Sequence, residues 1–407
     1  MKVGVWFVGA LGDVATTTVL GARAIARGLA APTGLVTARD LFRGLDLVAL
    51  DDLVFGGHDV REGDPVEAAR DLAQKGVVPH RLAEEPELQA DLRTFGARVR
   101  PGVAAGATRL VRRLESDAAR ERDRLAPAAA LAALRADLRA FRQAERLDRV
   151  VVVAVASTEP RPELADGALG TAQAVRALVA DERRKDDVPA SLLYALAAFD
   201  EGCAYVNFTP SLGASPAGMH AAALEAGVPH MGNDGKTGQT LVRTALAPMF
   251  RERNLDVLSW SGFNILGNRD GAVLDDPQAN AAKTRGKDRV LGAILGEQLG
   301  SSLTRIDYVP SLEDWKTAWD FIHFQGFLGT RMHLELTWRG ADSALAAPLV
   351  LDLARCLELA QRRGRSGLQT GLACFFKNPL GTDEQRLPAQ ERMLGEWVDG
   401  LRGGRGA

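Results

Sequence analysis

Leu147-Asp-Arg-Val-Val-Val-Val-Ala-Val-Ala156 contains the clearest buried strand in this chain of 407 residues. Its valines are β-branched and favour strands, and the run stays apolar at successive positions. A strand with this pattern is buried on both faces, as in a parallel sheet that is covered by helices above and below. The stretch therefore predicts the centre of a parallel α/β sheet.

Strands and helices alternate on both sides of this stretch. We predict strands at 2–9, 47–60, 205–209 and 228–231, and helices at 16–27, 65–74, 86–93, 191–199 and 217–226. Residues 107–146 are expected to form one or two long surface helices that are broken near Pro127. This alternation predicts an α/β fold with a doubly wound, Rossmann-like parallel sheet.

The pattern changes after Arg243. Strand-like runs at 256–266, 302–310, 321–324 and 332–338 outnumber the helices there, and a helix at 344–361 and a last short strand at 372–376 follow. We therefore expect residues 1–243 and 341–407 to form the Rossmann-like domain. Residues 244–340 are expected to form an inserted, mostly antiparallel α+β domain.

Composition excludes several classes of protein. The chain has 46% apolar and 25% charged residues and a net charge of −2, so neither a nucleic acid nor a membrane surface is expected as a partner. Its three cysteines lack the spacing of a zinc site or a disulfide framework. The sequence shows no signal peptide and no run of about 18 apolar residues, so a cytoplasmic location is expected.

Gly9-Ala-Leu-Gly-Asp-Val-Ala15 follows the first strand, where a dinucleotide-binding turn would lie. The match to Gly-x-Gly-x-x-Gly is incomplete, because Leu11 takes the second glycine position and Ala15 stands near the third. Asp13 also places a carboxylate where phosphates would bind. From the residues alone, a plain α/β turn remains an alternative.

Two further strand ends carry polar residues. His58 follows Gly56-Gly57 and is interpreted as a turn residue rather than as a catalytic base. The loop 232–240 ends like a phosphate loop, but His230 stands where the first glycine of that motif is required. The loop therefore offers one carboxylate and one ammonium group, those of Asp234 and Lys236, beside a helix N-terminus.

Lys283 and Lys287 lie four residues apart in a segment that is predicted to begin a helix. This spacing places both ammonium groups on one helical face, where they repel each other unless an anion is bound. The alternative is that both lysines are solvated, because lysine is rarely buried.

Several motifs, in order along nearly the whole chain, resemble the myo-inositol-1-phosphate synthase family. They are Val54-Phe-Gly-Gly-His-Asp59, Leu147-Asp-Arg-Val-Val-Val, Ser157-Thr-Glu159, Asn207-Phe-Thr-Pro210, Gly232-Asn-Asp-Gly-Lys-Thr-Gly-Gln-Thr240, Asn264-Ile-Leu-Gly-Asn-Arg-Asp-Gly271, Ala347-Pro-Leu-Val-Leu-Asp352 and Lys377-Asn-Pro-Leu380. The resemblance implies an isomerase that converts glucose 6-phosphate to inositol 3-phosphate with NAD. It also implies a homotetramer that assembles through the inserted domain, which would also be catalytic.

The family's reaction oxidises C5 of the open-chain sugar phosphate, removes a proton from C6, closes the ring by an aldol step onto C1 and reduces C5 again. The resemblance assigns Lys287 and Lys377 to the C5 and C1 oxygens, and Lys283 and Lys316 to the enolising centre or the phosphate. It places Asp234 and Asp352 near the nicotinamide and these lysines. The implied cofactor contacts are Gly9, Leu11, Gly12, Asp13, Val14, Asp59, Ala156, Ser157, Thr158, Thr209, Asp234, Thr237, Asn268, Arg269 and Asp270. Carboxylates and the substrate phosphate could also recruit a monovalent or divalent cation.

The sequence departs from the family in three places. The turn at 9–15 has fewer glycines and asparagines, Arg269 replaces an asparagine, and Pro160 replaces an arginine. These changes concern NAD binding and the choice of sugar. The alternatives are a divergent cyclase that makes another carbocycle, a net NAD-dependent dehydrogenase, and a catalytically silent NAD-binding regulator, against which the four lysines speak.

Overall fold

The structure is a computed structural model, and it describes residues 1–165, 167–267 and 289–403. In this part of the chain, seven strands form one parallel sheet in the order β11-β6-β5-β4-β1-β2-β3. The strands are β1 (Val3–Val8), β2 (Leu53–Asp59), β3 (Val99–Pro101), β4 (Arg149–Ala154), β5 (Ala204–Asn207), β6 (Pro229–Gly232) and β11 (Gly367–Leu368). The chain runs from β1 to one edge and then from β4 to the other edge. Doubly wound sheets open a crevice at this point of reversal.

Side chains of the central strands alternate between two hydrophobic cores. Val5 and Phe7 of β1 belong to one core, whereas Trp6 and Val8 belong to the other. The first face is covered by α1 (Asp13–Ala26), α2 (Pro65–Gln74), α3 (His80–Ala83), α4 (Pro86–Gly96), α14 (Asp342–Arg362) and α15 (Leu387–Arg402). The second face is covered by α7 (Pro127–Glu145), α8 (Ala172–Ala180), α9 (Ala190–Asp200) and α10 (Ala217–Glu225). The predicted α/β parallel sheet is therefore confirmed.

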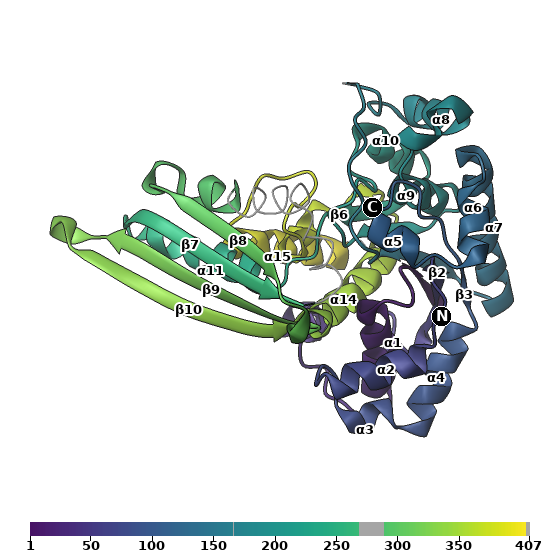
Figure 1. Cartoon of the computed structure of the whole chain (residues 1–407), viewed down its shortest axis with the longest axis horizontal. Helices are drawn as coiled ribbons and strands as arrows, with labels where there is room; N and C mark the ends of the chain where they lie inside the picture. Colours follow the sequence, from purple (N-terminus) through teal and green to yellow (C-terminus); the bar gives the residue numbers. More distant parts are fainter. Residues whose placement is uncertain (166, 268–288, 404–407) are drawn as a thin grey trace.

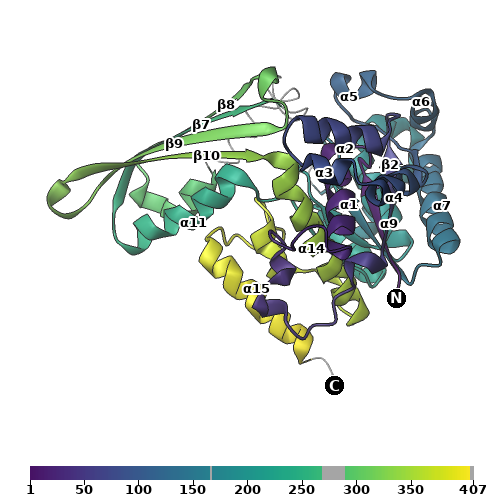
Figure 2. The same ribbon diagram turned by 90° about the horizontal axis from the view of Figure 1, so that it is seen from below.

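A second sheet extends away from the first (Figures 1 and 2). Its order is β10-β9-β7-β8, where β9 pairs antiparallel with β7 and β10, and β7 pairs parallel with β8. The strands are β7 (Asp256–Leu266), β8 (Ser302–Tyr308), β9 (Trp315–Gln325) and β10 (Arg331–Ala341). The helix α11 (Gly238–Glu252) and the helical residues 289–295 pack on this sheet through Phe250, Trp260, Leu291 and Ile322.

A buried polar cluster joins α11 to the second sheet. Arg243 of α11 contacts Asp320 of β9 at 3.1 Å and donates to Thr304 Oγ1 at 2.9 Å. Trp260 Nε1 and Gln239 Nε2 each donate to Asp320 at 2.7 Å. Arg243 and Asp320 are both 1% exposed, so neither charge is hydrated by bulk water. Each buried charge is compensated by its partner instead.

Several element predictions were wrong in their limits or type. The helix α1 begins at Asp13, three residues before its predicted start, because the chain turns at Gly12. Residues 47–52 precede the strand β2 and include the short helix η3 (Leu50–Asp52). Within 107–146 the structure has three helices, α5 (Arg109–Arg113), α6 (Asp117–Asp123) and α7.

The predicted last strand at 372–376 is instead a 3-10 helix, η8 (Thr370–Phe375). Its apolar residues are buried against α15, a helix that the sequence pattern did not reveal. A short apolar run does not distinguish a strand from a buried helical turn, which explains the error. The other short helical turns are η1 (Val36–Ala38), η2 (Asp40–Phe42), η4 (Glu182–Asp187), η5 (Gly296–Gln298), η6 (Pro310–Leu312) and η7 (Phe327–Gly329).

None of the described helices is long and apolar enough to cross a membrane.

Candidate active site

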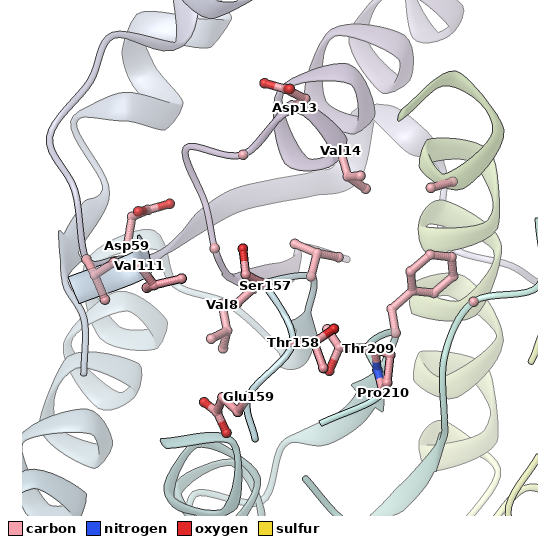
Figure 3. Close-up of a pocket in the computed structure, with 18 of the residues that line it drawn as sticks. Val8, Asp13, Val14, Asp59, Val111, Ser157, Thr158, Glu159, Thr209 and Pro210 are labelled. Carbon is pink, nitrogen blue, oxygen red and sulfur yellow. The ribbon is translucent and has the colours of Figure 1, made fainter. Parts of the chain in front are cut away.

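A cavity of about 300 Å³ opens at the carboxyl ends of the parallel strands (Figure 3). Segments that follow β1, β2, β3, β4, β5 and β6 all contribute to its lining, together with the start of β9, the start of α14 and Lys377. Figure 3 shows Asp59 on the opposite side of the cavity from α14. The cavity thus lies at the point where doubly wound sheets bind their ligands.

The turn after β1 has the backbone that a dinucleotide requires. Gly9 has a φ of +92°, and a Cβ on it would lie 2.9 Å from Ala156 Cα. Gly12 then forms the N-cap of α1, so the first N–H groups of the helix face this turn. Such a turn brings the positive end of a helix close to a pyrophosphate. The cavity is lined by Gly9, Gly12, Asp13, Val14 and Ala156, for which the family resemblance implies contacts with the cofactor.

Leu11 does not line the cavity, although it was predicted to contact the cofactor. Its side chain is buried, and its backbone N–H donates to Asp59 Oδ2 at 2.7 Å. Leu11 stands at the second glycine position of the dinucleotide motif. Its side chain lies outside the cavity lining, so it leaves the cavity open. Leu11 therefore connects the glycine turn to the end of β2.

His58 is a buried residue of the strand β2, so its interpretation as a turn residue was wrong. Trp6 Nε1 donates to His58 Nδ1 at 2.9 Å, which leaves Nε2 to donate to Asp137 Oδ2 at 3.0 Å. Burial lowers the pKa of His58, while Asp137 opposes this effect. With both ring nitrogens engaged, His58 is held neutral and does not act as a general base.

The loop after β4 supplies Ser157, Thr158 and Glu159, and the loop after β5 supplies Thr209 (Figure 3). Thr209 Oγ1 donates to Asn207 Oδ1 at 2.8 Å, which fixes this hydroxyl beside the sheet. Both carboxylate oxygens of Glu159 accept from Ser191 N at 3.1 Å, in the first turn of α9. Burial raises the pKa of Glu159 to about 7, although these hydrogen bonds oppose the shift.

Glu159→Gln is expected to make the free energy of unfolding less dependent on pH. The folded pKa of Glu159, about 7, lies above its ordinary value of 4.5. Its contribution to stability is therefore complete below that ordinary value and is lost as the pH rises through 7. Between pH 5 and pH 8 the wild type should lose about 2 kcal/mol more than the variant. Urea unfolding of both proteins at these two pH values measures this difference, and parallel losses would contradict it.

Lys377 and Asp234 form one ion pair at the cavity. Lys377 Nζ donates to Asp234 Oδ1 at 2.8 Å, and the side chains are 17% and 14% exposed. The backbones also pair, because Lys377 N donates to Asp234 O at 2.7 Å. Thr237, which lines the cavity as well, is the N-cap of α11. The predicted residues Asp234, Thr237 and Lys377 are therefore brought together.

Lys316 and Asp342 form a second pair, with 3.6 Å between Nζ and Oδ2. Lys316 comes from β9, and Asp342 is the first residue of α14. Asp314 lies beside them and accepts from Ser343 N and Oγ at 3.2 and 2.7 Å. Burial raises the pKa of Asp314 to about 6, and the charges of Asp342 and Asp13 add to this effect.

The sequence analysis did not single out Asp314 or Asp342, because neither belongs to a motif that it identified. The helix that begins at Asp342, directly after a strand, was the signal that could have revealed this residue.

Asp352 requires a correction. It does not line the cavity with Lys316 and Lys377. Its oxygens instead accept from Val36 N at 2.7 Å and from Thr37 N at 3.0 Å, so the carboxylate holds the turn η1 against α14. Burial raises the pKa of Asp352 to about 6. The carboxylate of α14 that pairs with Lys316 is instead that of Asp342, at the start of the same helix.

Five predicted site residues lie outside the described part of the chain. They are Asn268, Arg269, Asp270, Lys283 and Lys287. Within the described part, no group of three or more His, Cys, Asp and Glu side chains is arranged to hold a metal ion.

The chain is similar to known proteins along nearly its whole length. A family model described as myo-inositol-1-phosphate synthase matches residues 3–398. An inositol-3-phosphate synthase of Bacteroides thetaiotaomicron is 34% identical over 428 aligned residues, which cover 99% of this chain and 96% of that protein. The human inositol-3-phosphate synthase is 32% identical, and the match covers 78% of this chain but only 56% of the longer human protein.

Two solved structures share the fold. The inositol-3-phosphate synthase of Caenorhabditis elegans superposes with a TM-score of 0.82 at 23% identity, over 100% of this chain and 86% of that one. A myo-inositol-1-phosphate synthase-related protein from Thermotoga maritima gives 0.79 at 24% identity, over 98% and 99%. With a family model that matches almost the whole chain and a relative of similar length, this chain belongs to the myo-inositol-1-phosphate synthase family.

Proposed function

We propose that this chain is an NAD-dependent inositol-3-phosphate synthase that converts glucose 6-phosphate to inositol 3-phosphate. The observation that carries the proposal is a single cavity lined by both a glycine turn and two lysine–carboxylate pairs. The named relatives are inositol-3-phosphate synthases, which supports the same reaction. A cytoplasmic location and a sugar phosphate as substrate belong to this proposal.

The glycine turn at Gly9 and Gly12 would hold the dinucleotide, since a side chain at Gly9 would collide with Ala156. NAD, when bound, supplies the hydride chemistry, by accepting a hydride from the sugar and returning it. Lys316 and Lys377 provide positive charge where negative charge develops on the sugar oxygens. Asp234 orients the ammonium group of Lys377 at 2.8 Å, and Asp342 lies 3.6 Å from that of Lys316.

The two lysines reach the cavity from different parts of the fold. Lys377 follows η8 beside the parallel sheet, whereas Lys316 stands at the start of β9 in the second sheet. We propose that residues 1–243 and 341–407 bind the dinucleotide, and that residues 244–340 bring Lys316 to the sugar. Lys283 and Lys287 would add further cations, as the family resemblance implies.

We also propose a homotetramer that assembles through the second sheet. Alternate residues of β10 are exposed, and Phe327 and Leu328 at the β9–β10 turn are each 87% exposed. Large exposed apolar side chains are typical of association surfaces. Light scattering should give four times the chain mass of 43.5 kDa. A requirement for a bound cation remains a prediction from the sequence.

The reaction is tested by incubating the protein with glucose 6-phosphate and NAD and identifying the product by NMR. A synthase should form one inositol phosphate, and NADH should not accumulate, because each hydride returns to the ring. Steady accumulation of NADH would indicate a net dehydrogenase, and another carbocyclic product would indicate a divergent cyclase. Either result would refute the proposed reaction.

A further inference from the structure

The end of β2 is where a doubly wound fold places the adenosine ribose of a dinucleotide. Asp59 stands there, but both of its oxygens already accept backbone hydrogen bonds. Oδ2 accepts from Leu11 N at 2.7 Å, and Oδ1 accepts from Arg61 N at 3.1 Å. The carboxylate is only 6% exposed. Asp59 therefore braces the glycine turn, in addition to any contact that it makes with a ribose hydroxyl.

Arg61 lies over the same corner of the cavity. Its guanidinium donates to Leu11 O through Nη2, and its Nε is 3.7 Å from Asp59 Oδ1. Its side chain is 21% exposed, and the residue lines the cavity. The contacts with Leu11 and Asp59 hold the guanidinium at the ribose end of the turn. A guanidinium fixed in this way is suited to bind phosphate oxygens.

Arg61 differs from the other cationic residues of the cavity lining in its position. Among the lining residues that the structure describes, the cationic side chains are Lys316, Lys377 and Arg61. Lys316 lies at the α14 end with Asp342, whereas Arg61 is two residues from Asp59, which Figure 3 shows on the opposite side. Arg61 also offsets the charge of Asp59, which would otherwise repel an anion on the ribose.

We propose that Arg61 forms a binding site for the 2′-phosphate of NADP, so that this chain accepts both NAD and NADP. An arginine beside the ribose is the feature by which doubly wound folds accommodate that phosphate. The inference rests on the proposal that this cavity is the dinucleotide site.

Calorimetric titration of the full-length protein with NAD and with NADP tests the inference. The wild type should bind the two dinucleotides with dissociation constants within about tenfold of each other. Arg61→Gln keeps a polar side chain but removes the charge, so it should weaken NADP binding about tenfold or more and NAD binding less than threefold. Arg61→Lys retains the charge but loses the fixed guanidinium, so it should weaken NADP binding less than Arg61→Gln does.

A matched control is Arg43→Ala, which removes an arginine that is 78% exposed and lies outside the cavity lining. It should change neither affinity. The fragments 5′-AMP and 2′,5′-ADP isolate the added phosphate, and the wild type should prefer the second.

The outcomes separate this inference from the proposed function. If NAD binds but NADP binds more than tenfold less tightly, the 2′-phosphate site is refuted and the dinucleotide site stands. An equal loss of both affinities in Arg61→Gln would place the guanidinium on the pyrophosphate and also refute it. If neither dinucleotide binds, the assignment of the cavity itself fails.

Discussion

Lys377→Ala is expected to lower kcat by a factor of about 10² to 10³, the usual loss when one preorganised donor to a developing oxyanion is removed. Its ammonium group lies 2.8 Å from Asp234 Oδ1 and faces the cavity that holds the glycine turn. No other cation in the described lining occupies this place, since Lys316 pairs with Asp342 and Arg61 lies near Asp59. Steady-state formation of inositol phosphate measures the effect.

The affinity for NAD should change little in Lys377→Ala, because the glycine turn and Asp59 are untouched. The local backbone should also remain in place, since Lys377 N still donates to Asp234 O. Lys75→Ala serves as the control, because Lys75 pairs with Asp71 and lies outside the cavity lining. An unchanged kcat in Lys377→Ala would remove this residue from the catalytic machinery.

Asp320→Ala should lower the free energy of unfolding by about 3–5 kcal/mol, as expected when one partner of a buried ion pair is lost. The variant leaves the Arg243 guanidinium, 1% exposed, without its carboxylate. Trp260 Nε1 and Gln239 Nε2 lose their acceptor as well. Urea unfolding, followed by tryptophan fluorescence, measures the loss.

Two companion variants show whether the buried charge is responsible. Asp320→Leu combined with Arg243→Met removes both charges and should recover part of the lost stability, because no unpaired charge stays buried. Asp181→Ala breaks an exposed pair with Arg183, whose side chain is 90% exposed, together with one hydrogen bond from Arg183 N, and should cost far less than Asp320→Ala. A loss of similar size in Asp320→Ala and Asp181→Ala would contradict the role of the buried ion pair.

The buried ion pair between Arg243 and Asp320 also explains why residue 262 in the second sheet is a glycine. A Cβ on Gly262 would lie 2.0 Å from Arg243 Nη2, so the strand β7 leaves room for the guanidinium only because this residue has no side chain. The sequence shows the glycine but gives no sign of the arginine that requires it. The two positions are 19 residues apart and belong to different elements.

Local patterns were sufficient for the central elements. The valine run predicts β4, and the apolar stretch before Gly9 predicts β1, because burial on both faces requires continuous apolar sequence. The helix α2 begins at Pro65 and ends at Gln74 as predicted, since a proline in the first turn marks its start. The C-terminal helix α15 escaped prediction, because its mixed polar and apolar residues acquire a buried face through packing against distant elements, among them η8, α11 and η2.

The candidate site divides in the same way. The glycines at 9 and 12 and the polar residues after β4 and β5 follow strand ends, so the parallel sheet brings them to one edge. Asp59, the last residue of β2, was implied by the family resemblance. The sequence could not show which carboxylate of α14, that of Asp342 or that of Asp352, lies at the site. Both lie in α14, and only the packing of that helix shows that Asp342 meets Lys316, while Asp352 holds η1.

By itself, the sequence determined the parallel α/β sheet and the family, because both follow from short motifs whose residues are close together along the chain. The tertiary structure decided which distant charges meet. It paired Lys377 with Asp234 and Lys316 with Asp342, and it laid Arg61 against Asp59. Such contacts depend on how helices and sheets pack, since residues far apart in sequence become neighbours only when their elements bury shared apolar faces.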